Sequence, residues 1–131
     1  MARTRKSITF LDTHIVCWLF EGKTQLLTTT AAESIEHDDI FISPIVDLEL
    51  QYLYEIGRIA LPPGEVIGAL ANEIGLQIAD TQFTKIIAAS RLIDWTRDPF
   101  DRMIVGHAQL EKASLITRDR TIQQHFQQAI W

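Results

Sequence analysis

Four acidic residues stand where a folded chain would bring them to one place. Asp12 ends the apolar stretch ITFLD, and Asp119 follows SLITR; both stretches have the pattern of short buried strands. The carboxyl ends of parallel strands form the edge at which open α/β sheets place their sites. Glu49 and Asp101 lie on the apolar stripes of predicted helices and point inward, where an unpaired charge is costly. The spacing therefore predicts four converging carboxylates.

Such a cluster of carboxylates needs a positive partner. Like charges raise one another's pKa unless a cation lies among them, and the sequence has no lysine or arginine stripe to neutralise these acids. Oxygen ligands favour Mg²⁺ or Mn²⁺ over zinc. The histidines have neither zinc-like spacing nor cysteine companions, and we expect each to be structural or solvated: His14, His37, His107 and His125. The pattern indicates a hard divalent cation as cofactor.

The stretch RDPFDR contains a fifth acid. Asp98, Pro99 and Asp101 have the order of a helix N-cap, a proline at the first helical position and an acid at the third, which is the layout of a capping box. We expect Asp98 to cap the helix and to reach a metal at most through water. Asp101 is expected to face the site along the stripe of Ile104 and Ala108.

These acids need a scaffold, and the hydrophobic periodicity predicts one of alternating strands and helices. Short buried strands are predicted at residues 8–12, 40–43, 76–79 and 114–117. Helices are predicted at residues 14–20, 28–37, 44–56, 64–74, 81–92, 99–113 and 120–126. Gly22 and Gly57 are expected to end two helices, and Ser43 to cap the helix at 44–56. Alternating strands and helices predict an α/β fold with a parallel, helix-covered sheet.

Length and composition predict one domain, residues 1–131. The chain is 47% hydrophobic, which is enough to bury about two-thirds of its unfolded surface in one core. Cys17 is the only cysteine, so no intrachain disulfide can form and a reducing cytoplasm is the expected location. The apolar stretch after the basic start MARTRKS is too short for a signal peptide or a membrane span. The net charge of −5 argues against a conventional nucleic-acid binder covered in basic residues.

Four stretches together resemble a known family. In this order and at these separations, FLDTHIVCWLF, ISPIVDLELQYLYEIGRI, RDPFDRMIVGHA and LITRD are similar to the PIN-domain family, particularly the VapC-type toxins of toxin–antitoxin pairs. The resemblance spans residues 8–131. It implies a PIN-like three-layer α/β/α sandwich with a short, mainly parallel central sheet. It also implies a Mg²⁺-dependent endoribonuclease, usually a homodimer, with an antitoxin protein as partner.

The resemblance also assigns residues. The family's acidic positions fall on Asp12, Glu49, Asp101 and Asp119, with Asp98 as the additional acid of the DPFDR variant. Thr13 and Thr117 match hydroxyl positions that the family tends to use beside the metal. The plain alternative for these two threonines is that β-branched residues are common at strand ends.

The chemistry expected of such a site is metal-assisted phosphodiester hydrolysis of RNA. Carboxylates would hold one or two Mg²⁺, which lower the pKa of a bound water, orient it in line with the phosphorus and stabilise the leaving 3′-oxygen. Five site acids would account for the whole net charge. Weak, salt-sensitive RNA contacts are then expected from arginines near the site in sequence: Arg97, Arg102, Arg118 and Arg120. Solvated surface or internal pairing is the alternative, above all for Arg102.

The sequence leaves other functions open. A catalytically silent PIN fold that binds RNA or acts as a scaffold would not need uncompensated carboxylates, and a solitary RNA-processing nuclease would lack an antitoxin. A haloacid-dehalogenase-type phosphatase needs a second aspartate where His14 stands, and a flap-type DNA nuclease needs a longer chain. Four apolar residues could form a groove for a partner helix, with core packing as the alternative: Tyr52, Tyr54, Leu61 and Ile67.

Overall fold

The central sheet of the molecule is parallel. The computed structural model describes residues 6–131, and within them five strands pair in parallel in the order β3-β2-β1-β4-β5. Their bounds are β1 (Ile8–Leu11), β2 (Asp39–Ile42), β3 (Gln77–Ile78), β4 (Ser114–Ile116) and β5 (Ala129–Ile130). Strand β1 is central, and Phe10 pairs with Phe41 on one side and with Leu115 on the other. The predicted parallel sheet is confirmed.

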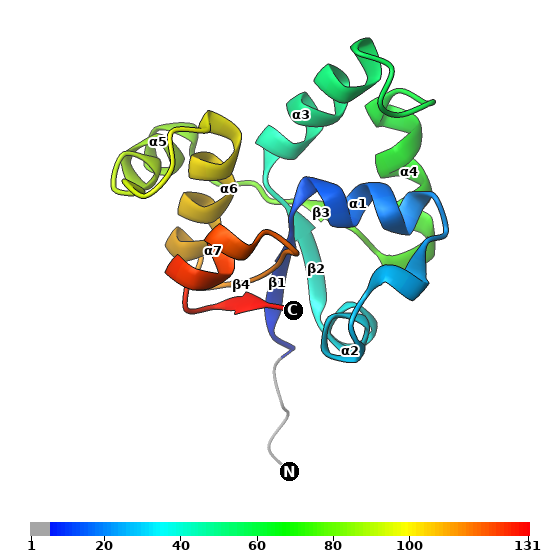
Figure 1. Cartoon of the computed structure of the whole chain (residues 1–131), viewed down its shortest axis with the longest axis horizontal. Coiled ribbons are helices and arrows are strands. Elements are labelled where there is room, and N and C mark those ends of the chain that lie inside the picture. Colours follow the sequence, from blue (N-terminus) through cyan, green and yellow to red (C-terminus); the bar gives the residue numbers. More distant parts are fainter. Residues whose placement is uncertain (1–5) are drawn as a thin grey trace.

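Helices cover both faces of this sheet, so the three-layer α/β/α arrangement is also confirmed. The helices of the described residues are α1 (Thr13–Phe20), η1 (Thr24–Leu26), α2 (Thr29–His37), α3 (Pro44–Glu55), α4 (Pro63–Ile74), α5 (Phe83–Ser90), α6 (Pro99–Leu110) and α7 (Arg120–His125). Figure 1 shows α5 and α6 on one side of the strands and α1, α2 and α4 on the other. Within residues 6–131, no helix has the length and apolar character needed to cross a membrane.

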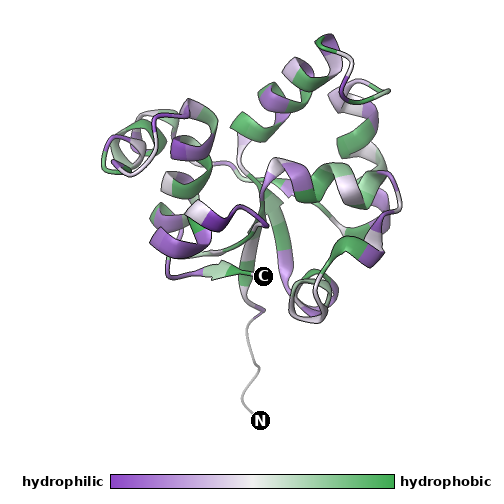
Figure 2. Cartoon of the chain, viewed as in Figure 1, coloured by the Kyte–Doolittle hydropathy of each residue, from purple (hydrophilic) through white to green (hydrophobic). Residues whose placement is uncertain are grey.

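The core lies between the sheet and its helices. Strand residues Phe10, Leu11, Ile42, Leu115 and Ile116 are almost completely buried, as expected for a parallel sheet that is covered on both faces. Figure 2 shows hydrophobic residues along the strands and on parts of every surrounding helix. Packing on both faces fixes the ends of β1 and β4, which gives the side chains that follow them a rigid frame.

Some helix ends differ from the prediction. Helices α5 and α6 stop short of the predicted ends at residues 92 and 113. Lys112 has a left-handed φ of 54°, which is incompatible with a continuing helix and turns the chain into β4. Gly22 and Gly57, with φ of 73° and 77°, follow α1 and α3 as predicted, because glycine adopts this conformation without steric cost.

A buried histidine joins three separate segments. In α6, His107 has Nδ1 2.8 Å from Ser43 Oγ and Nε2 2.8 Å from Thr81 Oγ1. The Thr81 hydroxyl donates to Glu111 Oε1 at 2.6 Å, so it must accept from Nε2–H, and Nδ1 then accepts from Ser43. Ser43 does occupy the N-cap position of α3, but its hydroxyl makes no capping hydrogen bond. The predicted N-cap position of Ser43 is thus confirmed, and its hydroxyl contacts His107.

Candidate active site

Asp12 lies where β1 ends and α1 begins. Its backbone N–H extends the sheet by donating to Ile116 O at 3.0 Å. Its carboxylate accepts two hydrogen bonds, from Thr13 N–H to Oδ1 at 2.8 Å and from the Thr117 hydroxyl to Oδ2 at 2.7 Å. Asp12 is only 4% exposed. The first residue of α1 and the residue after β4 thus fix this carboxylate at the carboxyl edge of the sheet.

Asp119 lies beside this carboxylate, just after β4. The Thr117 hydroxyl that donates to Asp12 also accepts from Asp119 N–H at 3.0 Å. Asp119 caps α7, because its Oδ1 accepts from Ile122 N–H at 3.0 Å. The Asp119 side chain is exposed. One threonine hydroxyl therefore connects the two acids that follow β1 and β4.

Glu49 reaches the same edge from α3. Its side chain is half-buried, and Oε1 accepts a hydrogen bond of 2.5 Å from the Thr13 hydroxyl. Thr13 is thus shared between two acids, with its N–H on Asp12 and its hydroxyl on Glu49. The inward direction expected for Glu49 brings it to the hydroxyl beside Asp12. Thr13 and Thr117 therefore orient three acidic residues between them.

Asp98 and Asp101 open α6 at the same site. Asp98 Oδ1 accepts from Phe100 N–H at 2.9 Å and from Asp101 N–H at 3.2 Å, which caps the helix. The capping box is incomplete, however, because Asp98 N–H donates to Thr96 Oγ1 at 3.2 Å and not to the Asp101 carboxylate. Asp101 is half-buried. Its carboxylate is therefore not committed to the cap and is available to a ligand.

The five carboxylates influence one another electrostatically. Burial, and after it the charges of the other four acids, raise the pKa of Asp101 to about 7. Burial likewise raises the pKa of Asp12, while the hydrogen bond from Thr117 opposes it. Burial also raises the pKa of Glu49 against the hydrogen bond from Thr13. A carboxyl group with a pKa near 7 carries a proton about half the time at neutral pH, so a cation bound there would displace it.

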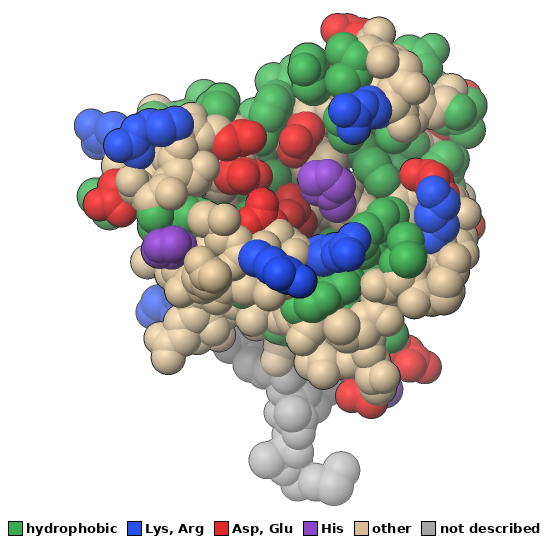
Figure 3. Space-filling view, in the orientation of Figure 1, with side chains coloured by type: hydrophobic (Ala, Val, Ile, Leu, Met, Phe, Trp, Pro, Cys, Tyr) green, Lys and Arg blue, Asp and Glu red, His purple; other side chains and the backbone are tan. Residues whose placement is uncertain are grey.

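Basic side chains do not neutralise this cluster. Among the described residues the only ion pair joins Lys23 and Glu21, neither of which is a site acid. Figure 3 shows acidic side chains gathered in a hollow of this face, with a histidine and basic side chains around it. The oxygen donors suit a hard divalent cation. Within residues 6–131, no three His, Cys, Asp or Glu side chains already form a metal shell.

A comparison with known families decides the classification. Residues 9–125 match the family described as PIN domain. The chain belongs to the PIN domain family. PIN domains are generally nucleases that use divalent metals, which agrees with the chemistry of the donor set. Among curated protein sequences the chain has no significant match.

Solved structures share the fold of this PIN domain. A protein from a toxin–antitoxin complex of Klebsiella pneumoniae has a TM-score of 0.64 and 20% identity, over 94% of this chain and 96% of that chain. VapBC2 from Rickettsia felis, bound to a promoter DNA fragment, has a TM-score of 0.57 and 20% identity, over 89% of this chain and 92% of that chain. VapBC-1 from nontypeable Haemophilus influenzae has a TM-score of 0.57 and 22% identity, over 95% of this chain and 96% of that chain. At these identities the likeness shows the fold alone.

The arginines expected to contact RNA have different surroundings in this PIN domain. Arg102 donates from Nε and Nη2, each at 3.3 Å, to two backbone carbonyls at the end of α5, which is a structural role. Arg97 donates to a backbone carbonyl of the preceding loop at 2.9 Å. Arg118 and Arg120 are exposed, and neither forms an ion pair within residues 6–131. Of the four arginines, Arg118 and Arg120 therefore have the positive charge that is most available to a ligand.

Two residues that lie beside the acids of the PIN domain were not identified as site residues from the sequence. His14 and Trp18 line a pocket of about 220 Å³ together with Asp12, Arg118 and Asp119. His14 is solvent-exposed, but its charge also lowers the pKa of Asp12, so it stands next to the cluster. Their spacing could have indicated them. His14 follows Asp12 by two residues, and Trp18 lies one helical turn after His14 on the same face of α1.

Proposed function

We propose that this PIN domain is a Mg²⁺- or Mn²⁺-dependent endoribonuclease that cleaves single-stranded RNA. The observation that carries the proposal is the set of five acids at one sheet edge, with no ion-paired cation among the described residues. Buried and half-buried like charges destabilise a fold. A protein that used this sheet only as a scaffold would be more stable without them, whereas a bound divalent cation offsets their repulsion.

Direct metal ligands are assigned to four acids by their position and chemistry: Asp12, Glu49, Asp101 and Asp119. Asp98 is assigned an indirect contact through water, because its carboxylate caps α6. Thr13 and Thr117 hold the carboxylates of Asp12 and Glu49 through their hydrogen bonds. These threonines preorganise ligands that would otherwise rotate apart, as outer hydrogen-bond partners do at metal sites.

The proposed reaction is hydrolysis of a phosphodiester bond. A bound divalent metal supplies water activation and stabilises the charge on the leaving 3′-oxygen. The chain would supply the ligand charge, and Asp101, whose pKa is about 7, would lose its proton on holding the ion. Asp119 and Asp98 are exposed and mark the open side of the edge, from which a phosphate group can approach.

RNA binding must overcome the negative charge of the chain. The five site acids equal the net charge of −5, so neutralising them leaves the chain close to neutral. We assign phosphate contacts to Arg118 and Arg120, which are exposed, and a weaker contact to Arg97, which is tethered to its own loop. Arg102 is not assigned a contact, because it caps α5. Such contacts release counterions, so RNA binding should weaken as salt rises.

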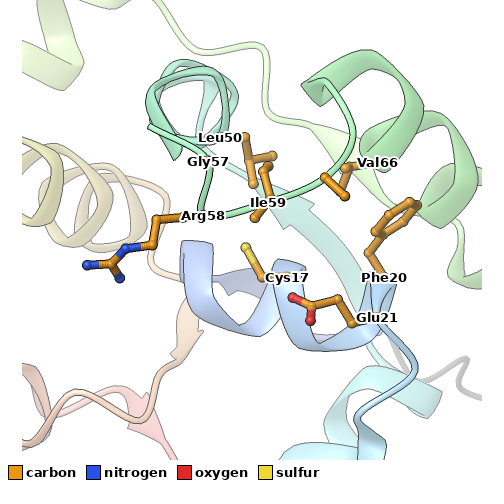
Figure 4. Close-up of a pocket in the computed structure, with 9 residues that line it drawn as sticks. Cys17, Phe20, Glu21, Leu50, Gly57, Arg58, Ile59 and Val66 are labelled. Carbon is orange, nitrogen blue, oxygen red and sulfur yellow. The ribbon is translucent and has the colours of Figure 1, made fainter. Parts of the chain in front are cut away.

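An antitoxin is the proposed protein partner, which makes this chain the toxin of a VapBC-type pair, cytoplasmic and homodimeric. Solved structures of toxin–antitoxin and VapBC complexes that share this fold favour the assignment. The chain offers a groove of about 310 Å³ formed by α1, the α3–α4 loop and α4. Leu50, Ile59 and Val66 give it apolar walls, and Figure 4 shows Arg58 and Glu21 on opposite sides of it. An amphipathic segment suits such a groove.

The apolar residues expected from the sequence to form a partner groove do not line this one. Tyr52, Tyr54 and Leu61 are exposed, but none of them borders the groove. Ile67 is partly buried and packs against the hydrophobic core, which is the alternative that the sequence left open. The groove is instead lined by the α3–α4 loop, which turns at Gly57 with a φ of 77°, and by residues of α1, α3 and α4.

The test of the nuclease proposal is cleavage of single-stranded RNA by the full chain with Mg²⁺, with Mn²⁺ and in excess EDTA. Cleavage that needs either ion supports the proposal. Undiminished cleavage in EDTA contradicts the metal requirement, and no cleavage by folded, metal-saturated protein favours the silent RNA-binding or scaffolding module. Asp12→Asn is the matched control, because it keeps the shape and removes one ligand charge. It should be folded and inactive; near-normal turnover would exclude Asp12 from the ligand set.

A second measurement separates a toxin from a solitary RNA-processing nuclease. The product of a short neighbouring gene should co-purify with the chain and block its cleavage of RNA. A chain that cleaves RNA but has no such neighbour is better explained as a solitary nuclease.

A further inference from the structure

A pocket of about 220 Å³ opens beside the acidic edge. Asp12 and Asp119 form the wall that it shares with the proposed metal site. The other lining residues have a different chemistry: His14 and Trp18 of α1 are aromatic, and Arg118 is cationic. Phosphodiester hydrolysis at the acids does not require a flat aromatic surface or a cation at this position. The pocket therefore calls for a separate explanation.

Trp18 and Arg118 form one composite surface in this pocket. The Arg118 guanidinium carbon lies 5.7 Å from the centre of the Trp18 ring, which is the geometry of a cation–π contact. Trp131 supports the indole, with ring centres 6.0 Å apart and an interplanar angle of 49°. Trp18 is half-buried and Arg118 is exposed. The indole thus orients a guanidinium group whose charge remains open to solvent.

This surface has a fixed position relative to the acids. Trp18 lies on α1, the helix that Asp12 caps, and Arg118 lies between two residues joined by the hydrogen bond from Asp119 N–H to Thr117 Oγ1. The structure shows no ion pair between Arg118 and any acid of residues 6–131, although Asp119 is its sequence neighbour. An aromatic plane and an available positive charge are therefore held next to the carboxylates.

We propose that this pocket is a subsite for one nucleotide of a single-stranded RNA, the nucleotide next to the phosphodiester bond that is cut. Its base would lie against the Trp18–Arg118 surface, because single-stranded RNA is bound by stacking on aromatic rings and guanidinium planes. Arg118 would also offset the phosphate charge. The proposal rests on the proposed RNA-cleaving function, and it names the residues that hold the strand in register with the acids. Stacking accepts any base, so this subsite gives affinity more than sequence choice.

Binding can be measured without cleavage by fluorescence anisotropy of a labelled single-stranded RNA oligonucleotide, titrated with the full chain in EDTA at low salt. Trp18→Leu should weaken binding at least about fivefold, since it removes the stacking plane. Trp18→Phe should restore most of the affinity, because it retains an aromatic ring. Arg118→Gln should weaken binding and reduce the slope of log affinity against log salt by about one phosphate contact.

Matched controls lie on α5, outside this pocket. Phe83→Leu removes an aromatic ring that is 64% exposed, and Lys85→Gln removes one exposed positive charge. Both should bind RNA within about twofold of the unaltered chain. Circular dichroism and thermal melts establish that each variant is folded. Should Trp18→Leu fail to fold, Trp18→Phe and Arg118→Gln still test the two halves of the surface.

The subsite and the nuclease can fail separately. Pocket-dependent RNA binding without metal-dependent cleavage would support the subsite and contradict the nuclease. The opposite result is that cleavage requires Asp101 but the Trp18→Leu variant binds RNA as tightly as the unaltered chain. This result would overturn the subsite and leave the nuclease proposal standing. Equal losses of RNA affinity in Trp18→Leu and Phe83→Leu would also overturn the subsite. The effect would then come from any exposed aromatic side chain and not from this pocket.

Discussion

The acidic edge and the buried histidine chain behind it share the same two helices, yet they are built in opposite ways. Helix α6 carries both Asp101 and His107, and α3 carries Glu49 and has Ser43 as its N-cap residue. In the histidine chain, hydroxyl and imidazole groups pair in order and end on Glu111. At the edge, four of the five carboxylates accept hydrogen bonds from N–H or hydroxyl groups, and no ion pair within residues 6–131 includes any of the five.

We propose that this difference separates polar groups that hold the fold from polar groups that serve chemistry. His107 is fully buried, and burial lowers its pKa, so it is neutral and bonded at both ring nitrogens. Buried groups of this kind stabilise a unique packing. Asp101 has a raised pKa of about 7 because it is buried among like charges, which is unfavourable unless a cation binds.

The largest effect is expected from Asp101→Asn, which keeps the shape and removes a ligand charge. Cleavage should fall at least about 100-fold, because a direct ligand is lost. The metal-free protein should melt at a higher temperature, since a half-buried carboxylate with a pKa of about 7 no longer repels its neighbours. Rates at saturating Mg²⁺ and thermal melts in EDTA measure the two effects.

Asp98→Asn is the matched control on the same helix. Asparagine caps a helix about as well as aspartate, so the free energy of unfolding should change by less than about 0.5 kcal/mol. Measurable cleavage should remain. If Asp98→Asn is inactive while Asp101→Asn is active, the two roles are reversed. If both remain active, the acidic edge is not the catalytic site.

His107→Phe should have the opposite consequence to Asp101→Asn. Phenylalanine can keep the edge contact with Phe10, whose ring centre lies 4.9 Å from the imidazole, but it leaves the Ser43 hydroxyl without its acceptor. The free energy of unfolding should fall by about 2 kcal/mol, the cost of a buried unsatisfied group. Urea denaturation measures this loss. Cleavage assayed well below the melting temperature should persist, and its disappearance from a stable variant would contradict the division between the two regions.

The two regions should also respond to pH in opposite directions in EDTA. The folded pKa of Asp101 is raised to about 7, so its protonation stabilises the fold progressively as pH falls from 7 towards 3.8. The folded pKa of His107 is lowered from 6.5, so the unfolded chain binds its proton first and stability is lost as pH falls below 6.5. Between pH 7 and 5, Asp101→Asn should therefore lose more stability than the unaltered chain, and His107→Phe should lose less. Melting temperatures that shift identically in all three proteins would show that neither group controls the profile.

Ser43→Ala should have the smallest effect. It removes the donor to His107 Nδ1 but no capping hydrogen bond, because the Ser43 hydroxyl does not cap α3. The free energy of unfolding should fall by about 1 kcal/mol, with no change in cleavage. Chemical denaturation of Ser43→Ala and His107→Phe under the same conditions ranks how much each residue contributes to the free energy of unfolding. A larger loss for Ser43→Ala than for His107→Phe would mean that the serine acts through another contact.

Local patterns in the sequence were sufficient for the sheet and for the approximate position of the acids. Apolar stretches that end in Asp12 and Asp119 predict adjacent strand ends, because parallel strands present their carboxyl ends at one edge. The partner of Ser43 could not be predicted, since His107 lies 64 residues away and the pairing depends on how α6 packs. The incomplete capping box has a similar cause: Thr96 competes for Asp98 N–H, and only the fold of the preceding loop brings it there. Roles at the site stay predictions until the variants are measured.

The central position of β1 also determines when the edge is completed during protein synthesis. Asp12 leaves the ribosome long before Thr117, which orients its carboxylate and lies 105 residues later. Strand β1 can pair with β2 early, but its other neighbour, β4, is among the last elements to emerge. A domain folds as a unit once its segments are available. A nascent chain therefore carries Asp12, Glu49 and Asp101 before β4, the strand that closes the edge, has emerged.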